Sequence, residues 1–390
     1  EKEYSQSYGI RKEAACAKKG KRIDWSMVVM VDKAASVLAK LRNKAKASGI
    51  SYQQCLQLFV QEEFLRKLSK SGCEDTLILK GGLFIYTLTN FESRATIDVD
   101  FLLRGYPNSI DDIKDLIGKI IATPTGNDYI EMRAKGFEEI SPQRKYHGIS
   151  TQIIAQIKNV RVPFNVDIGV GDIIVPRAEE RTINTQLPDF EAPVIKTYSL
   201  ESTIAEKFDA ILQRFELTGR MKDFYDIYYL SRTFDFEGAK LQAAIFETLQ
   251  RRGTPYDRDS FKRVVALADD EDMQKRWKFF LKTIKDNTLE FPFVIEEIQT
   301  FLEPVFDAIV NEKEWQNIWK GNAKILQAST ITLDRINLPM AKLDSGLMPE
   351  ECRRLIRNLY RNRPGINWEV QQLDYLLLEY INESKEPKLF

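Results

Sequence analysis

The sequence is short of several features that would place it at once in a common class. It has one histidine, His147, and four cysteines with no Cys-x-x-Cys pair among 390 residues. This cysteine usage argues against a zinc site and against a secreted disulfide scaffold, and it fits a reducing cytoplasm. No run approaches the roughly 18 apolar residues of a membrane-spanning helix. We therefore expect a cytoplasmic protein without a membrane partner.

The chain also lacks a net charge. Lys plus Arg equals Asp plus Glu at 57 each, so no global field attracts nucleic acid or an anionic membrane. Any polyanion must be bound by a local patch. Hydrophobic residues make up 43% of the chain, which at this length can bury a sizeable core, and we expect two domains.

The sequence does contain a pair of glycines between a predicted strand and a predicted helix. Lys80-Gly81-Gly82 follows an apolar strand pattern at 76–79, and a helix pattern begins at Leu83. Glycines in such a turn let backbone N–H groups approach a triphosphate at the positive end of the helix. The pattern therefore predicts a phosphate-binding turn.

Two acids follow on alternate positions of a predicted strand. In Arg94-x-Thr96-x-Asp98-x-Asp100 the side chains of Asp98 and Asp100 point to the same side, because strand residues alternate between faces. Their backbone positions are then roughly 7 Å apart, and the two carboxylates can share a pair of Mg²⁺ ions. Each pattern alone also fits an ordinary helix entry or a solvated strand, but their order favours metal-assisted nucleotidyl transfer.

A third acid lies on the strand predicted at 162–170, the second strand of a hairpin with 150–157. Apolar residues alternate there with polar ones, so Asp167 lies opposite the apolar face. It could simply be a solvent-exposed acid on the polar face of the strand. Paired against the strand of Asp98 and Asp100, it would instead complete a three-carboxylate site, in which it holds a metal ion and accepts the proton of the attacking hydroxyl.

A helical pattern begins at Tyr198, and Lys207 falls inside its apolar stripe. The ammonium group must therefore reach solvent or meet an anion, and a nucleotide phosphate is one candidate. On the next helix, Asp223 and Asp226 are one turn apart, so at least one could be half-buried and paired with Arg214, Arg220 or Lys207. The alternative is that both acids only complement the helix dipole.

The rest of the chain is predicted to be helical, at 238–250, 260–268, 272–286, 293–319, 349–360 and 368–381. Basic and aromatic residues interleave at 275–282. Such a stretch can bind phosphates and stack bases, although an ordinary amphipathic helix also explains it.

Taken in order, these motifs resemble those of the AbiEii/AbiGii abortive-infection toxins. The likeness spans roughly residues 75–320. The matching positions are Lys80-Gly81-Gly82 with Arg94-x-Thr96-x-Asp98-x-Asp100, then Asp167, then Glu206-Lys207-x-x-Ala210 with Arg214, and last Arg220-x-Lys222-Asp223-x-x-Asp226.

The resemblance implies an α+β fold: a polymerase-beta-like nucleotidyltransferase sheet domain at 23–195, followed by a helical domain at 196–320. A basic arm at 1–22 and a helical C-terminal extension at 321–390 have no assigned role. The implied activity is transfer of a nucleotide from an NTP, with two Mg²⁺ ions, to an RNA acceptor such as tRNA. The implied setting is a bacterial toxin–antitoxin system of phage defence, with a winged-helix antitoxin as partner.

The resemblance also implies roles for individual residues. Asp98, Asp100 and Asp167 would bind the metal ions, Lys207 would neutralise charge on the triphosphate, and Asp223 would fix Lys207 or the nucleobase end. The nucleotide-binding set is Lys80, Gly81, Gly82, Arg94, Thr96, Lys207 and Asp226. Many members have Ser or Thr after the paired glycines, where this chain has Leu83, so one hydroxyl contact to phosphate is missing.

Two other functions use the same residues. A kinase or a hydrolase could be built on the same metal site, with a protein or a small molecule as acceptor. An inactive member of the family could bind RNA or a partner chain without catalysis. The sequence names neither the NTP nor the acceptor, and it leaves the oligomeric state open.

Overall fold

The structure, a computed structural model, describes residues 32–321 except for 90–92, 95, 97, 141–147, 218 and 287. The chain divides into two units after Gly321, and every described residue lies in the first. The arm at 1–22, His147 and the helices predicted at 349–360 and 368–381 lie outside the described residues.

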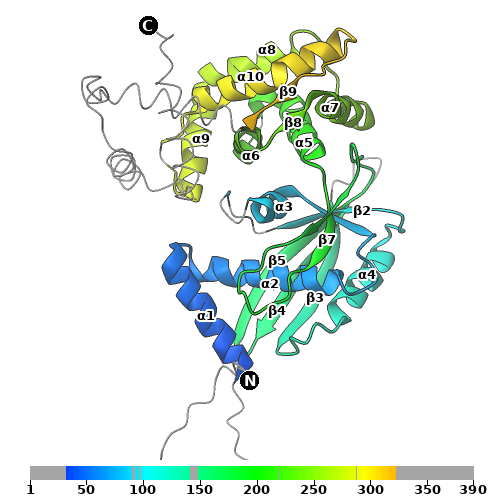
Figure 1. The fold of residues 1–390 in the computed structure, drawn as a ribbon, viewed down its shortest axis with the longest axis vertical. Helices are drawn as coiled ribbons and strands as arrows, with labels where there is room; N and C mark the ends of the chain where they lie inside the picture. Colours follow the sequence, from blue (N-terminus) through cyan, green and yellow to red (C-terminus); the bar gives the residue numbers. More distant parts are fainter. Residues whose placement is uncertain are drawn as a thin grey trace, which may run out of the picture. The chain divides into compact units, whose positions relative to one another are not determined.

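A mixed sheet of seven strands is the centre of the first half of the described chain (Figure 1). Its spatial order is β3-β4-β5-β2-β1-β7-β6. The strands are β1 (Leu77–Lys80), β2 (Val99–Leu103), β3 (Ile130–Ile140), β4 (Gly148–Ile157), β5 (Val160–Gly169), β6 (Glu179–Thr182) and β7 (Val194–Thr197).

Two pairings at the middle of the sheet bring the predicted motifs together. Strand β1 runs antiparallel to β2 and places Lys80 opposite Asp100. Strand β2 runs parallel to β5 and places Asp100 opposite Asp167. The glycine turn and two of the three predicted acids therefore meet where these three adjacent strands lie side by side, as the sequence predicted.

Helices pack on the sheet and continue after it (Figure 1). They are α1 (Lys33–Ser48), α2 (Tyr52–Leu68), α3 (Gly81–Leu88), α4 (Ile110–Ala122), α5 (Leu200–Leu212), α6 (Met221–Thr233), α7 (Gly238–Arg252), α8 (Ser260–Ala266), α9 (Glu271–Ile284) and α10 (Phe291–Val310). Local signals start several of them: the side chain of Ser109 accepts from the amide of Asp112, and that of Ser199 from Ser202. The predicted α+β order, a sheet first and helices after it, is confirmed.

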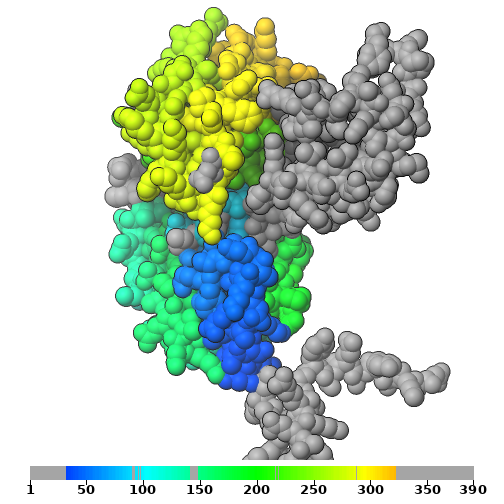
Figure 2. All heavy atoms as spheres, turned by 90° about the vertical axis from the view of Figure 1, so that its left-hand side faces the viewer, coloured from blue at the N-terminus to red at the C-terminus, as the bar shows by residue number. Residues whose placement is uncertain are grey.

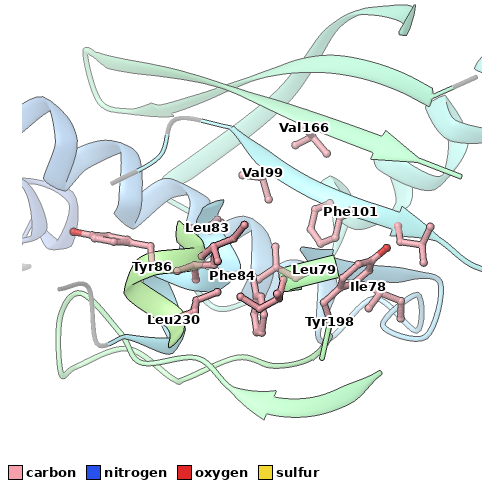
Figure 3. Packing of buried hydrophobic residues seen from close by; sticks show 14 of the residues in the cluster. Ile78, Leu79, Leu83, Phe84, Tyr86, Val99, Phe101, Val166, Tyr198 and Leu230 are labelled. Carbon is pink, nitrogen blue, oxygen red and sulfur yellow. The ribbon is translucent and has the colours of Figure 1, made fainter. Parts of the chain in front are cut away.

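The core beneath the glycine turn joins strands to helices (Figure 3). Leu79 of β1, Val99 of β2 and Val166 of β5 pack in one cluster with Leu83 of α3 and Leu230 of α6. Leu83 is 2% exposed. Leu83, which follows the paired glycines, therefore supplies apolar packing.

Two predictions about elements were wrong. The helix predicted at 293–319 ends at Val310, and Ile318–Trp319 forms a short strand, β9, that pairs with β8 (Phe236–Glu237). The indole of Trp319 donates to the carbonyl of Ser231, a tertiary contact that overrides the apolar pattern. Strands β3, β6 and β7 were also missed, because β3 is a half-exposed edge strand and the other two have four residues each.

Candidate active site

The turn between β1 and α3 brings backbone and carboxylate unusually close. Gly81 has a φ of +70°, which residues with a side chain rarely adopt. A Cβ there would lie 2.8 Å from the Cβ of Asp100 and would overlap its carboxylate. A Cβ on Gly82 would lie 2.9 Å from the hydroxyl oxygen of Thr96. Both glycines are therefore required by close approach of the acidic segment.

The three predicted metal-binding acids are held by different means. Asp100 and Asp167 are direct neighbours across β2 and β5, and the hydroxyl of Ser150 donates to Oδ1 of Asp167 over 2.5 Å. Strand β2 begins at Val99, so Asp98 lies just before the strand, where its Oδ1 accepts from the amide of Asn165 over 3.3 Å. Burial raises the pKa of Asp167, and repulsion from Asp100 and Asp98 raises it further.

These acids fit a divalent cation in their chemistry. Carboxylate oxygens are the hard ligands that Mg²⁺ prefers, and a cation would relieve the repulsion among the three groups. Within the described part of the chain, no three acidic, histidine or cysteine side chains are already gathered closely enough to hold a metal ion. Metal binding would therefore have to draw Asp98, Asp100 and Asp167 together.

On the facing helices, the predicted cation is buried among acids. Nζ of Lys207 lies 2.6 Å from Oδ2 of Asp226 and 3.3 Å from Oδ1 of Asp223. The guanidinium of Arg94 donates to both oxygens of Asp226, over 2.8 and 2.6 Å, and Nε of Arg220 donates to Asp223 over 2.5 Å. The prediction that Asp223 or Asp226 is buried and paired is confirmed for both.

A second ionic cluster lies beside the first and includes Lys80. Nζ of Lys80 lies 2.7 Å from Asp172 and 3.3 Å from Glu206, and Arg252 bonds to both Asp172 and Asp209. Burial favours the neutral acid at Asp172, but Lys80 and Arg252 outweigh it and lower the pKa of Asp172. At Glu206 burial prevails and raises the pKa. The cluster joins the end of β1 to α5 and α7.

A cavity of about 750 Å³ lies between the sheet and these helices. The predicted residues that line it are Lys80, Gly81, Gly82, Arg94, Asp100, Asp167, Lys207 and Asp223. Thr96 lines a neighbouring cavity, Asp226 lies behind Lys207 and Arg94, and Asp98 lines neither cavity.

Further residues of this cavity had been named only as motif positions or as possible ion-pair partners, namely Glu206, Arg214, Arg220 and Lys222, and others had not been named at all: Asp172, Tyr198, Asp209 and Arg252. Some carried a signal in the sequence. Asp172 follows the end of an apolar strand, and Glu206 precedes Lys207. Arg252 had none, because only folding brings it within 2.9 Å of an acid 80 residues away.

Comparison with known proteins agrees with this geometry. A model of the family described as nucleotidyl transferase AbiEii toxin, type IV toxin–antitoxin system, matches residues 63–317, well over half of the chain. The chain belongs to this family. It is therefore a nucleotidyltransferase toxin, as the motifs predicted, and the matched AbiEii segment includes both walls of the cavity.

Solved structures give weaker likenesses to this AbiEii protein. A Helicobacter pylori protein assigned as a nucleotidyltransferase has 13% sequence identity and a TM-score of 0.39, with 66% of this chain and 98% of that chain covered. JHP933 from the same organism has 15% identity and a TM-score of 0.37, with 65% and 94% covered. Among curated proteins, none matches significantly.

No described helix of this AbiEii protein combines the length and the apolar character needed to cross a bilayer.

Proposed function

We propose that the protein transfers a nucleotide from an NTP to an RNA acceptor such as tRNA, in a Mg²⁺-dependent reaction. The supporting observation is that Asp100 and Asp167 are neighbours in register across β2 and β5 and line the same cavity as the glycine turn. Membership of the AbiEii family supplies the class of reaction.

The glycine turn is proposed to hold the triphosphate. The first backbone N–H groups of α3 lack partners within the helix, Lys80 provides no side-chain cap, and neither glycine of the turn has a Cβ that would obstruct a ligand. Lys207 would contribute charge to the triphosphate while it remains bonded to Asp226, and Asp223 would keep its ammonium in place. Lys80, Arg94 and Thr96 complete the proposed nucleotide site.

The acids are proposed to divide two tasks. Asp98, Asp100 and Asp167 would hold the metal ions, which when bound supply positive charge to the triphosphate and to the reacting oxygens. Asp167 would also accept the proton of the acceptor hydroxyl, since it lines the cavity and Ser150 orients one of its oxygens.

Membership of the family supports a proposal for the biological setting. We propose that the enzyme acts in the cytoplasm as the toxin of a phage-defence pair and that a winged-helix antitoxin restrains it. Toxicity would then require the same carboxylates as nucleotide transfer. A cell that expresses the Asp100→Asn protein should grow normally, whereas the wild type without its antitoxin should not.

The direct test uses each of the four NTPs in turn, labelled at the α-phosphate, with Mg²⁺ and total cellular RNA. A labelled RNA band is expected for the wild type and none for Asp100→Asn. A parallel set with label at the γ-phosphate detects the alternatives. Nucleotide transfer should release that label as pyrophosphate, a γ-labelled acceptor would indicate a kinase, and labelled orthophosphate with no acceptor labelled in either set would indicate a hydrolase. Either result would refute the proposal.

A further inference from the structure

A second cavity opens beside the first. It has a volume of about 1140 Å³ and lies between α2, the segment around Arg94, the start of α6, and α9. That volume exceeds the range of roughly 300 to 1,000 Å³ usual for small-molecule pockets. Its size therefore favours an extended ligand over a compact one.

The lining of this cavity has a strong charge bias. Six of its side chains are basic, and no acidic residue is among the described residues that line it. The basic residues are Arg94, Arg220, Lys222, Lys275, Arg276 and Lys285. In a chain with equal numbers of basic and acidic residues, this cavity is a local patch of the kind that a polyanion requires.

The acids nearest to these cations do not cancel the bias at the surface. Asp226 and Asp223, which pair with Arg94 and Arg220, are 1% and 0% exposed and lie behind them. Lys275 pairs with Asp272 of its own helix over 3.1 Å, but both side chains are well exposed. Such an exposed pair adds little stability, so a phosphate can replace the carboxylate easily.

An aromatic side chain stands at the rim of the cavity. Phe279 of α9 is 72% exposed, whereas Trp277, two residues earlier, is buried in the core. Lys275 lies one turn before Phe279, and the i, i+4 spacing places both on the same side of the helix. Helix α9 therefore presents a cation and an uncovered aromatic face next to each other, which packing within the described residues does not require.

The two cavities adjoin each other. Arg94, Arg220 and Lys222 line both of them. At the far rim, Nζ of Lys285, the C-cap residue of α9, donates to the carbonyl of Gly49, the C-cap residue of α1, over 3.3 Å. Figure 2 shows this side of the molecule, with α1 and α2 in blue and α9 in yellow-green. A single-stranded nucleic acid whose end lies beside Asp100 would pass these three cations on its way to the second cavity.

We propose that the second cavity holds the single-stranded end of the RNA acceptor, with phosphates on Lys275 and its basic neighbours and a base stacked on Phe279. The inference rests on the proposed function and assigns the acceptor to a place in the protein. Stacking requires a base whose face is free, which single-stranded RNA offers and duplex RNA does not. The basic side chains bind the phosphates of the RNA, and stacking on Phe279 distinguishes a nucleic acid from other polyanions.

The test measures binding and does not depend on catalysis. Fluorescence anisotropy would follow a short unstructured RNA, labelled with fluorescein, as it binds to full-length protein without NTP. The variants are Phe279→Ala and Lys275→Glu. Their matched controls are Phe246→Ala, a partly exposed phenylalanine on α7 outside both cavities, and Lys278→Glu, an exposed lysine on α9 outside the cavity.

Phe279→Ala should raise the Kd for RNA by about 5- to 100-fold, the effect of losing one stacked base. It should leave the Kd for heparin, a polyanion without bases, unchanged. Lys275→Glu should weaken the binding of both ligands. The plot of log association constant against log salt should become less steep, by about 0.7 for each phosphate that the variant no longer binds. The two control variants should bind RNA as the wild type does. Circular dichroism and thermal unfolding verify that each variant is folded.

The outcomes separate the two proposals. If Phe279→Ala and Lys275→Glu bind RNA as tightly as their controls, the second cavity is not the acceptor site, and a protein partner becomes its better occupant. The inference fails in the same way if Phe279→Ala weakens RNA and heparin binding equally. If the wild type binds RNA through Phe279 but labels no RNA with any NTP, the proposed function fails while the binding site remains.

Discussion

The two walls of the candidate active-site cavity carry acids in different states. On the sheet side, Asp100 and Asp167 face each other across β2 and β5, and neither forms an ion pair with another described residue. On the helical side, Asp223 and Asp226 are buried, and each bonds to two cations. The first pair concentrates negative charge that a bound cation would relieve, and the second pair holds buried cations in place. Under the proposed function, the same residue type therefore serves catalysis on one wall and architecture on the other.

The largest expected effect is that of Asp100→Asn. The change should lower nucleotide transfer by at least about 100-fold, the scale on which single groups that stabilise transition-state charge act. Because it removes one of several clustered like charges, the thermal midpoint of unfolding should stay the same or rise slightly. Asp115→Asn, at an exposed position of α4, is the control for both measurements. A large fall in stability would show that Asp100 belongs with the structural acids.

Asp226→Asn should, unlike Asp100→Asn, lower the stability of the fold. It weakens the attraction for two buried cations, Arg94 and Lys207, which are 8% and 10% exposed. Removing one partner of a buried ion pair usually costs about 3–5 kcal/mol, so the free energy of unfolding measured in urea should fall on that scale. Asp272→Asn, which breaks an exposed pair on α9, should cost less than about 1 kcal/mol. Equal losses in the two variants would remove the distinction between the walls.

Gly81→Ala separates backbone strain from displacement of the catalytic acid. Any side chain at a φ of +70° costs about 1–2 kcal/mol, and Gly126→Ala, at +81° with nothing nearby, should lose a similar amount. Only at position 81 would the new methyl group overlap the carboxylate of Asp100. Nucleotide transfer should therefore fall in Gly81→Ala and stay unchanged in Gly126→Ala. If both variants retain transfer, the close approach of Asp100 to the turn is not needed for catalysis.

Much of the sheet wall could be predicted because its signals are local. Glycines between a strand and a helix, acids at alternate positions and a serine before a helix all lie within a few residues of each other. The alternation at 162–170 was enough to place Asp167 on the face opposite the core, and its pairing with the strand of Asp100 is confirmed.

The helical wall could be predicted only in part. The apolar stripe around Lys207 required that its ammonium find solvent or an anion, and the spacing of Asp223 and Asp226 offered Lys207 as one of three possible partners without choosing among them. The bond between Arg94 and Asp226 joins residues 132 positions apart, and that between Lys80 and Glu206 spans 126. No local pattern encodes such pairs, since they exist only when the sheet and the helices are packed together.

Glu62 of α2 tests whether a partner is sufficient to keep a buried acid ionised. It shares Arg66 with Glu63, so one cation serves two carboxylates. Burial raises the pKa of Glu62 from 4.5 to about 7, despite the amide of Gln186 and the guanidinium of Arg66. The folded state therefore keeps a proton that the unfolded state has released, and the contribution of this group to stability falls as pH rises from about 4.5 to about 7.

Glu62→Gln should remove that part of the pH dependence, which is at most about 1.4 kcal/mol per pH unit. Urea unfolding of wild type and variant at several pH values across the window gives the difference in slope, and titrating groups common to both proteins cancel. Glu247→Gln, at an exposed position of α7, should follow the wild type. If the free energies of Glu62→Gln and wild type change in parallel, Arg66 keeps both acids ionised. One guanidinium shared by two carboxylates would then be enough to keep both ionised. The difference between the two cavity walls would depend on whether an acid has a cationic partner and not on how many acids share that partner.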